Sequence, residues 1–187
     1  CFGLLADMMG LQVHLYGGRF EESAACSESF LQSYDAGRHR AFADLYSTDL
    51  ELVCLVHRAI NAFILGDPEE ADRYAGQAED VAGGLDHPYS YAWCHTWGTL
   101  VDLWLGRADR AAERCREGMR IARDQGYAYV SALGAMVLGW AKGELGDPEA
   151  GAREIEEGLT TFRSTGAEFV VPFFQTLQAE RLIRAGC

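Results

Sequence analysis

Apolar residues in this chain recur at helical spacing, and the runs that they form stop on glycine at a constant interval. Four of these glycines are Gly66, Gly106, Gly146 and Gly186, so the same shift relates each one to the next. Around them the apolar positions follow the repeat of one helix face, and no run alternates as a β-strand does. Each segment is therefore predicted to be a pair of helices joined by a tight turn, and the fold class to be all-α.

The predicted first helix of each pair precedes its glycine and is the more apolar one. These helices cover residues 50–65, 89–105, 127–145 and 173–185, and a leading pair covers residues 4–16 and 20–34. Asp67 and Asp147 suit N-caps of the second helices, where Pro68 and Pro148 suit the first helical position. The count is about nine antiparallel helices.

Three second helices carry the same stripe of small or apolar residues, which superpose under the shift that relates the glycines. We predict that this stripe is buried, because small side chains let one helix approach the next closely. The stripe consists of Ala71, Ala75, Ala78 and Ala82, then Ala111, Cys115, Gly118 and Ala122, then Gly151, Ile155, Gly158 and Phe162.

An earlier turn glycine, Gly18, precedes Gly66 by more than the common interval, so we expect an extra turn or loop near residues 37–40. A fixed repeat of about 40 residues is typical of stacked helical hairpins. The segment 65–71 resembles the centre of a tetratricopeptide repeat. The resemblance implies a right-handed α-α superhelix, a tetratricopeptide-like solenoid, in one domain spanning residues 1–187 with turns at 18, 66, 106, 146 and 186.

Composition narrows the class of protein. The net charge of −12 opposes direct binding to nucleic acid, and no apolar run is long enough to cross a membrane. The six cysteines are scattered without paired spacing, so we expect them to be reduced and the chain to be cytoplasmic. The first residues lack an initiator methionine and a signal-peptide pattern, so we expect a fragment of a larger protein.

Three stretches across residues 15–187 resemble the C-terminal helical region of multidomain class III adenylate or guanylate cyclases that carry an AAA or STAND-type ATPase module. They are residues 39–42 leading to 53–55, residues 85–92, and residues 138–141 continuing through 158–159 and 162–168 to 172–174. The resemblance implies a bacterial signalling context, with the chemistry of the parent protein in other domains.

No catalytic or cofactor-binding motif is present in the sequence, and we expect no enzyme activity of this fragment and no cofactor. Cys54 and His57 lie three apart on one predicted helix, but a structural zinc site needs four ligands, so no metal site is predicted. The Gly139-to-Gly143 spacing indicates a close helix crossing. Arg114, Arg120 and Arg123 are expected on a solvated face.

Aromatic residues are concentrated on two of the first helices. We consider two interpretations of this set, which comprises Tyr91, Trp93, Trp97, Trp104 and Trp140. It forms a core stripe, as the spacing of the tryptophans favours, or it lines a concave binding face.

The leading hypothesis is a noncatalytic interaction or ligand-sensing module that regulates attached cyclase and ATPase domains. Its expected partner is a protein, a peptide or another domain of the same chain, and self-association through exposed apolar terminal repeats is a further candidate. The alternative is the sensor solenoid of a large ATPase-type transcription activator with a separate helix-turn-helix domain.

Overall fold

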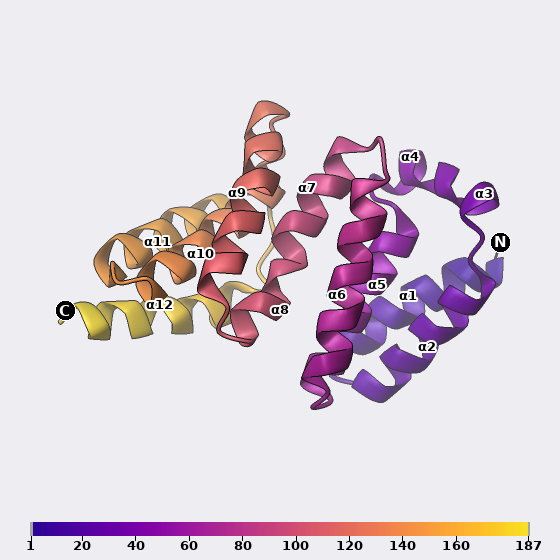
Figure 1. The fold of residues 1–187 in the computed structure, drawn as a ribbon, viewed down its shortest axis with the longest axis horizontal. Helices are drawn as coiled ribbons and strands as arrows, with labels where there is room; N and C mark the ends of the chain where they lie inside the picture. Colours follow the sequence, from indigo (N-terminus) through magenta and orange to yellow (C-terminus); the bar gives the residue numbers. More distant parts are fainter. Residues whose placement is uncertain (1, 187) are drawn as a thin grey trace. The chain divides into compact units, whose positions relative to one another are not determined.

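The computed structural model describes residues 2–186, and this part of the chain is helical and contains no β-strand (Figure 1). The prediction of an all-α fold is confirmed. In chain order the elements are α1 (Phe2–Tyr16), α2 (Phe20–Ser33), α3 (Ala36–His39), the 3-10 helix η1 (Arg40–Phe42), α4 (Ala43–Tyr46), α5 (Leu50–Ile64), α6 (Pro68–Gly83), α7 (Pro88–Trp97), α8 (Thr99–Trp104), α9 (Ala108–Asp124), α10 (Ala128–Glu144), α11 (Pro148–Ser164) and α12 (Val171–Ala185).

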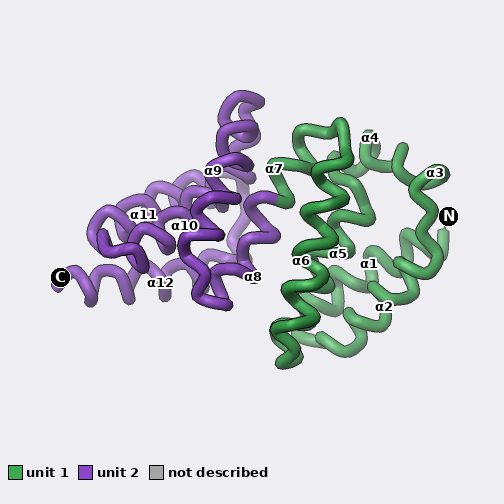
Figure 2. The backbone as a smooth tube through the Cα atoms, viewed as in Figure 1, with its two compact units in different colours: residues 1–94 green, residues 95–187 purple. Residues whose placement is uncertain are grey.

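The chain forms two compact units, residues 1–94 and residues 95–187, and their boundary falls within α7 (Figure 2). In the first unit α1 packs on α2, both pack on α5, and α5 packs on α6. In the second unit α10 packs on α8, α9, α11 and α12, and α12 also packs on α11. The most extensive contacts within each unit thus join helices that are neighbours in sequence. A single domain over residues 1–187 remains a prediction.

Each helix pair turns on a glycine in the left-handed backbone region. Gly66, Gly106 and Gly146 have φ values of 89°, 71° and 110°, which a residue with a Cβ adopts at a cost. The next helix starts two residues later, and Asp67 and Asp147 cap α6 and α11 by accepting hydrogen bonds from backbone N–H groups. The sequence predicted both caps correctly.

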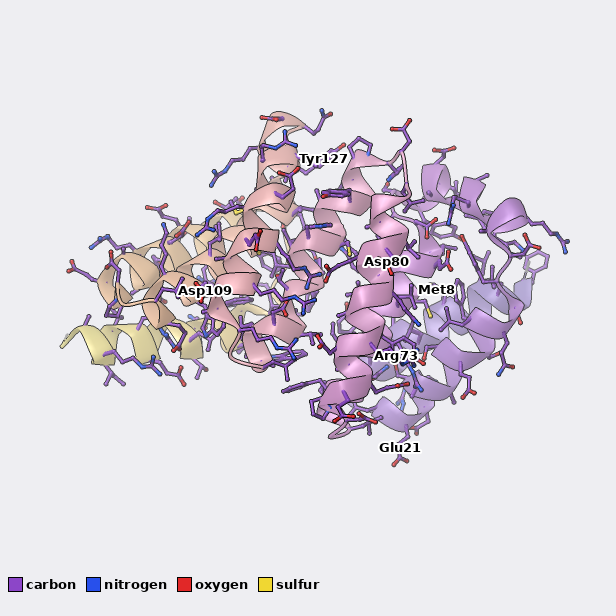
Figure 3. All side chains as sticks on the ribbon, viewed as in Figure 1. Met8, Glu21, Arg73, Asp80, Asp109 and Tyr127 are labelled. Carbon is purple, nitrogen blue, oxygen red and sulfur yellow. The ribbon has the colours of Figure 1, made fainter. Side chains whose placement is uncertain are left out.

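The predicted stripe on the second helices is buried at every position. On α6, α9 and α11 its members are the residues that face the adjacent helices, whereas the charged side chains of these helices, apart from Arg114, are at least partly exposed. Figure 3 labels four such exposed side chains, Glu21 on α2, Arg73 and Asp80 on α6, and Asp109 on α9. The second helices are therefore amphipathic in the sense that the sequence predicted.

The Gly139-to-Gly143 spacing marks a close crossing of α10 with α11, as predicted. A Cβ placed on Gly139 would lie 2.7 Å from the carbonyl oxygen of Gly151. A Cβ on Gly143 would collide with the side chain of Arg181 from α12, whose guanidinium is buried and pairs with Glu144 at 2.5 Å. The two glycines of α10 thus leave room for the backbone of α11 and for the side chain of Arg181.

Two details of the fold differ from or extend the sequence prediction. The prediction of one continuous helix over residues 89–105 is wrong, because the helix is interrupted at Gly98, between α7 and α8. Next to the break, the Thr99 hydroxyl donates to the carbonyl oxygen of Thr96, and such bonds compete with helix continuation. The extra residues before Gly66 form the short helices α3, η1 and α4, which include the predicted segment 37–40.

Candidate functional site

The five aromatic residues singled out by the sequence fall in both units. Tyr91 and Trp93 belong to the first unit, and Trp97, Trp104 and Trp140 to the second. Trp93, Trp97 and Trp140 are buried, whereas Tyr91 and Trp104 are partly exposed. The three buried indoles contribute to the cores of their units, which agrees with the core interpretation of these positions. A concave binding face that includes all five remains a prediction.

In the first unit, Trp93 lies beside a buried histidine. The ring centroids of His57 and Trp93 are 6.0 Å apart, and the Tyr16 hydroxyl is 3.1 Å from His57 Nε2. His57 Nδ1 lies 2.7 Å from the carbonyl oxygen of Val53, which only accepts, so Nδ1 carries the proton and Nε2 accepts from Tyr16. Burial lowers the pKa of His57 to about 4. The imidazole is therefore neutral and locked by two hydrogen bonds.

Buried polar side chains continue along the same face of α5. Asn61 Nδ2 donates to Ser23 Oγ at 2.8 Å, and Ser23 in turn donates to the carbonyl oxygen of Leu11 at 2.7 Å. The Cys54 thiol donates to the carbonyl oxygen of Ser27 at 3.6 Å. These contacts join α5 to the α1–α2 hairpin, so this polar chain holds two helix pairs together.

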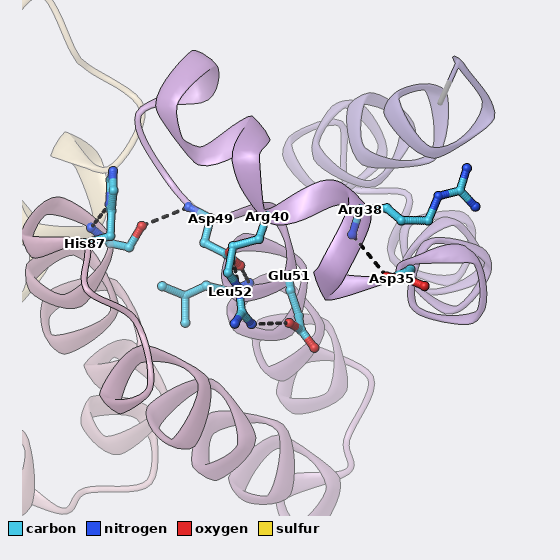
Figure 4. Close-up of polar contacts among 8 residues, drawn as sticks. Asp35, Arg38, Arg40, Asp49, Glu51, Leu52 and His87 are labelled. Atoms are coloured by element: carbon cyan, nitrogen blue, oxygen red, sulfur yellow. Dashed lines mark hydrogen bonds and ion pairs between the residues drawn. The ribbon is translucent and has the colours of Figure 1, made fainter.

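A second polar cluster lies where the short helices meet the start of α5 (Figure 4). Asp49 accepts from the Leu52 backbone N–H at 3.1 Å, and its own N–H donates to Ser90 Oγ at 2.8 Å. Arg40 lies 3.6 Å from the Asp49 carboxylate and 3.3 Å from that of Glu51. Burial, and then the charge of Asp49, raise the pKa of Glu51. The cluster caps α5 and ties it to α7, with both carboxylates paired to one arginine.

In the second unit, Trp97 belongs to a closed set of four aromatic rings. Its ring stacks on Phe169 at a centroid distance of 5.6 Å and an interplanar angle of 6°, and lies 6.2 Å from Tyr129. Phe162 closes the set, at 5.2 Å from Tyr129 and 6.0 Å from Phe169. Phe169 comes from the segment between α11 and α12 and is 51 % exposed, so the cluster reaches the surface.

Sequence reasoning missed two members of this cluster, although a signal for them is present. Tyr89, Tyr129 and Phe169 are related by the same shift as the turn glycines, so an aromatic ring recurs at one position of the repeat. Trp104 makes a separate contact with Phe173 of α12, at a centroid distance of 6.4 Å. The predicted tryptophans are thus completed by aromatic residues of later helices.

The most enclosed charge of the second unit is Asp102 on α8. Its carboxylate is fully buried and lies 2.5 Å from Arg114, 3.4 Å from Arg110 and 3.9 Å from Arg107. Arg114 is itself only 8 % exposed. The expectation that Arg114 lies on a solvated face is therefore wrong, because residue 114 turns toward α8, whereas Arg120 and Arg123 are exposed as expected.

Metal and thiol chemistry depend on how the ionisable side chains group together. Among residues 2–186, no three His, Cys, Asp or Glu side chains converge in a way that could hold a metal ion. Cys26, Cys54, Cys94 and Cys115 are free thiols, and burial raises the pKa of Cys115 to about 12. Cys1 and Cys187 lie outside the described residues. No helix among residues 2–186 has both the length and the apolar character needed to span a membrane.

The largest group of exposed apolar side chains on one helix belongs to α1. Phe2, Met9 and Val13 are 94 %, 59 % and 56 % exposed. Leu5 and Ala6 lie between them at helical spacing, and we call these five residues the α1 outer stripe. The opposite face of α1 is buried through Leu4, Met8, Leu11 and Leu15. This helix is therefore apolar on two faces, of which only one is covered.

Exposed apolar residues also occur on α12, where Leu182 and Ile183 are 39 % and 73 % exposed. No family model matches the chain, and no curated protein is significantly similar to it. The candidate functional surfaces are therefore defined by geometry alone. They are the α1 outer stripe and the surface-reaching aromatic cluster of Trp97, Tyr129, Phe162 and Phe169.

Proposed function

We propose that this chain is a noncatalytic interaction module, built as a tetratricopeptide-like α-solenoid, that binds a protein, a peptide or another domain of its own polypeptide. The observation that carries the proposal is the buried small-residue stripe that recurs on α6, α9 and α11 at one constant interval. Hairpins that share such a stripe stack on one another, and stacked hairpins create extended surfaces that proteins use for binding.

Exposed apolar residues favour binding over a purely structural role. The α1 outer stripe places large apolar side chains in water along one helix, and such patches mark interaction sites. The net charge of −12 favours a partner with a neutral or basic surface. The exposed apolar stripe and the negative net charge both support a role in binding a partner.

We further propose that the module regulates attached cyclase and ATPase domains. The support is the resemblance to the helical region of class III cyclases, which is carried by residues 39–42 with 53–55, by residues 85–92, and by residues 138–141 with 158–159, 162–168 and 172–174. Binding to the module would shift the population of an inhibited arrangement of the attached domains. The reading frame around this chain tests the context directly. A cyclase domain and a phosphate-binding loop support the proposal, whereas a helix-turn-helix domain supports a transcription activator instead.

The biochemical test uses the protein that contains this chain and measures nucleotide cyclisation with and without residues 1–187. Regulation predicts a change of at least about fivefold in rate on removal, the lower range of allosteric coupling. Tyr91→Ala and Trp104→Ala, at the two partly exposed positions of the predicted face, should reduce that coupling. Trp140→Phe, a conservative change in the core, is the matched control. An unchanged rate in every variant contradicts the proposal.

A further inference from the structure

The helix face that is exposed in α1 is covered in the equivalent helix of the next pair, α5. Gly18 and Gly66 are the turn glycines after α1 and α5. Under the shift that superposes Gly18 on Gly66, the α1 outer stripe corresponds to Leu50, Val53, Cys54, His57 and Asn61 of α5. All five of these residues are buried. One face of two equivalent helices is thus covered in α5 and exposed in α1.

The cover on α5 is the preceding helical hairpin. Asn61 bonds to Ser23 of α2, Cys54 to the Ser27 carbonyl oxygen, and His57 to the Tyr16 hydroxyl. The contacts on α2 come from two small residues four positions apart, which lets α2 lie close against α5. This interface indicates that a helix with small residues along one stripe fits the equivalent face of α1.

We propose that the α1 outer stripe is a docking surface for an α-helical hairpin whose second helix carries a stripe of small apolar residues. This partner hairpin packs on α1 as the α1–α2 hairpin packs on α5. The inference rests on the proposed binding function and names the class of partner. It concerns one surface only, so the rest of the proposed function does not depend on it.

The side chains of α1 also specify the chemistry of the partner. Val13 and Met9 stand where α5 has Asn61 and His57, so α1 offers neither the amide donor nor the imidazole acceptor. A partner residue opposite Val13 meets no side-chain hydrogen-bond donor, so it must be small but does not need a hydroxyl. At the equivalent position this chain has Ala71, Ala111 and Gly151 in its later hairpins and serine only in α2. The fitting hairpin therefore resembles α5–α6 rather than α1–α2.

A graft supplies such a hairpin in register. Residues 50–89 of this chain are joined to the N-terminal side of Phe2, so that the grafted copy of Gly66 precedes Gly18 by the common interval of the repeat. The readouts are amide hydrogen exchange of α1 and the Tm of the whole chain. We expect exchange in α1 to slow by about tenfold or more and Tm to rise, because burial of Met9 and Val13 stabilises the helix.

Variants separate docking from a general effect of the added segment. Val13→Glu should leave the Tm of the ungrafted chain unchanged, since this side chain is already in water, but should abolish the slowing in the grafted protein. Ala71→Glu within the graft should abolish it as well, and Ala71→Ser should reduce it. Unchanged exchange of α1 in the graft overturns the proposal, whether or not the added segment folds.

Light scattering of the ungrafted chain tests the other occupant, a second copy. We expect a monomer at micromolar concentration, because net charge opposes self-association. A dimer that Val13→Glu dissociates overturns the proposed partner class in favour of self-association. Failure of the graft leaves the regulation assay on Tyr91 and Trp104 unaffected, so the two proposals fail separately.

Discussion

Gly139 on α10 and Gly151 on α11 face each other without a side chain between them. A Cβ on Gly151 would lie 2.5 Å from the Gly139 carbonyl oxygen, and one on Gly139 would lie 2.7 Å from the Gly151 oxygen. Distances this short require a backbone to move, so the two glycines set the separation of α10 and α11. The small-residue stripe of the second helices is thus a packing requirement at this crossing.

Gly151→Ala is expected to lower the free energy of unfolding by about 1–3 kcal/mol, because overpacking forces the two backbones apart. Urea denaturation followed by circular dichroism measures the change. Gly76→Ala on α6 is the matched control, since no atom lies within 4 Å of the added Cβ. There we expect no loss and a gain of up to about 1 kcal/mol from helix propensity. Equal effects of the two substitutions would contradict the close-crossing account.

Stability is expected to decrease as pH falls from 7 to 5 because of His57. Burial holds the pKa of His57 at about 4 in the folded chain, below its ordinary value of 6.5. The unfolded chain therefore binds this proton first, and the contribution to stability is present above pH 6.5 and lost as pH falls toward the folded value. The expected loss is about 2 kcal/mol between pH 7 and pH 5.

Denaturation of His57→Gln and of the parent chain at several pH values checks this assignment. The variant should lose most of the slope between pH 7 and pH 5, whereas His14→Gln, a change of the same kind on α1, should retain it. A slope that persists in His57→Gln would assign the pH dependence to other groups.

The Asp102–Arg114 pair should be costly to break and cheap to replace. Asp102→Leu leaves the buried Arg114 without its closest carboxylate, and loss of one partner of a buried pair costs about 3–5 kcal/mol. The double variant Asp102→Leu with Arg114→Met should recover part of that loss, as a double-mutant cycle in urea measures. Arg120→Ala, at an exposed pair with Glu117, should change stability by less than about 1 kcal/mol. Additive effects at Asp102 and Arg114 would contradict the pairing.

Phe169→Ala should destabilise the second unit although the side chain is half-exposed. The ring stacks on Trp97 and contacts Phe162, and an aromatic pair contributes about 0.5–1.5 kcal/mol beyond burial. A decrease of about 1–2 kcal/mol in the free energy of unfolding is expected, with a change in tryptophan fluorescence. Phe2→Ala, at a ring that is 94 % exposed, should change stability by less than about 0.5 kcal/mol. Identical results for the two rings would show that the stack is not stabilising.

The helices, their turns and their buried faces could be predicted from the amino-acid order alone, because these features follow from local rules. Period, caps and left-handed glycines act within a few residues, so Asp67, Gly106 and the stripe from Ala71 to Ala82 could be read directly. The sequence did not reveal the break at Gly98, because Trp97 before it and Leu100 after it continue the helical pattern of apolar residues. The burial of Arg114 was not predicted either, since the charge of its side chain predicts a solvated position.

Contacts between residues far apart in the sequence could not be predicted, because they depend on the assembled fold. Asp102 draws Arg114 into the interior across two helices, and Phe169 stacks on Trp97 from a distant part of the sequence, so neither contact is visible in a local pattern. The open face of α1 required comparison with the covered face of α5, because both helices look equally apolar in sequence. Burial depends on what packs against a helix, and that is a property of the assembled fold rather than of the helix itself.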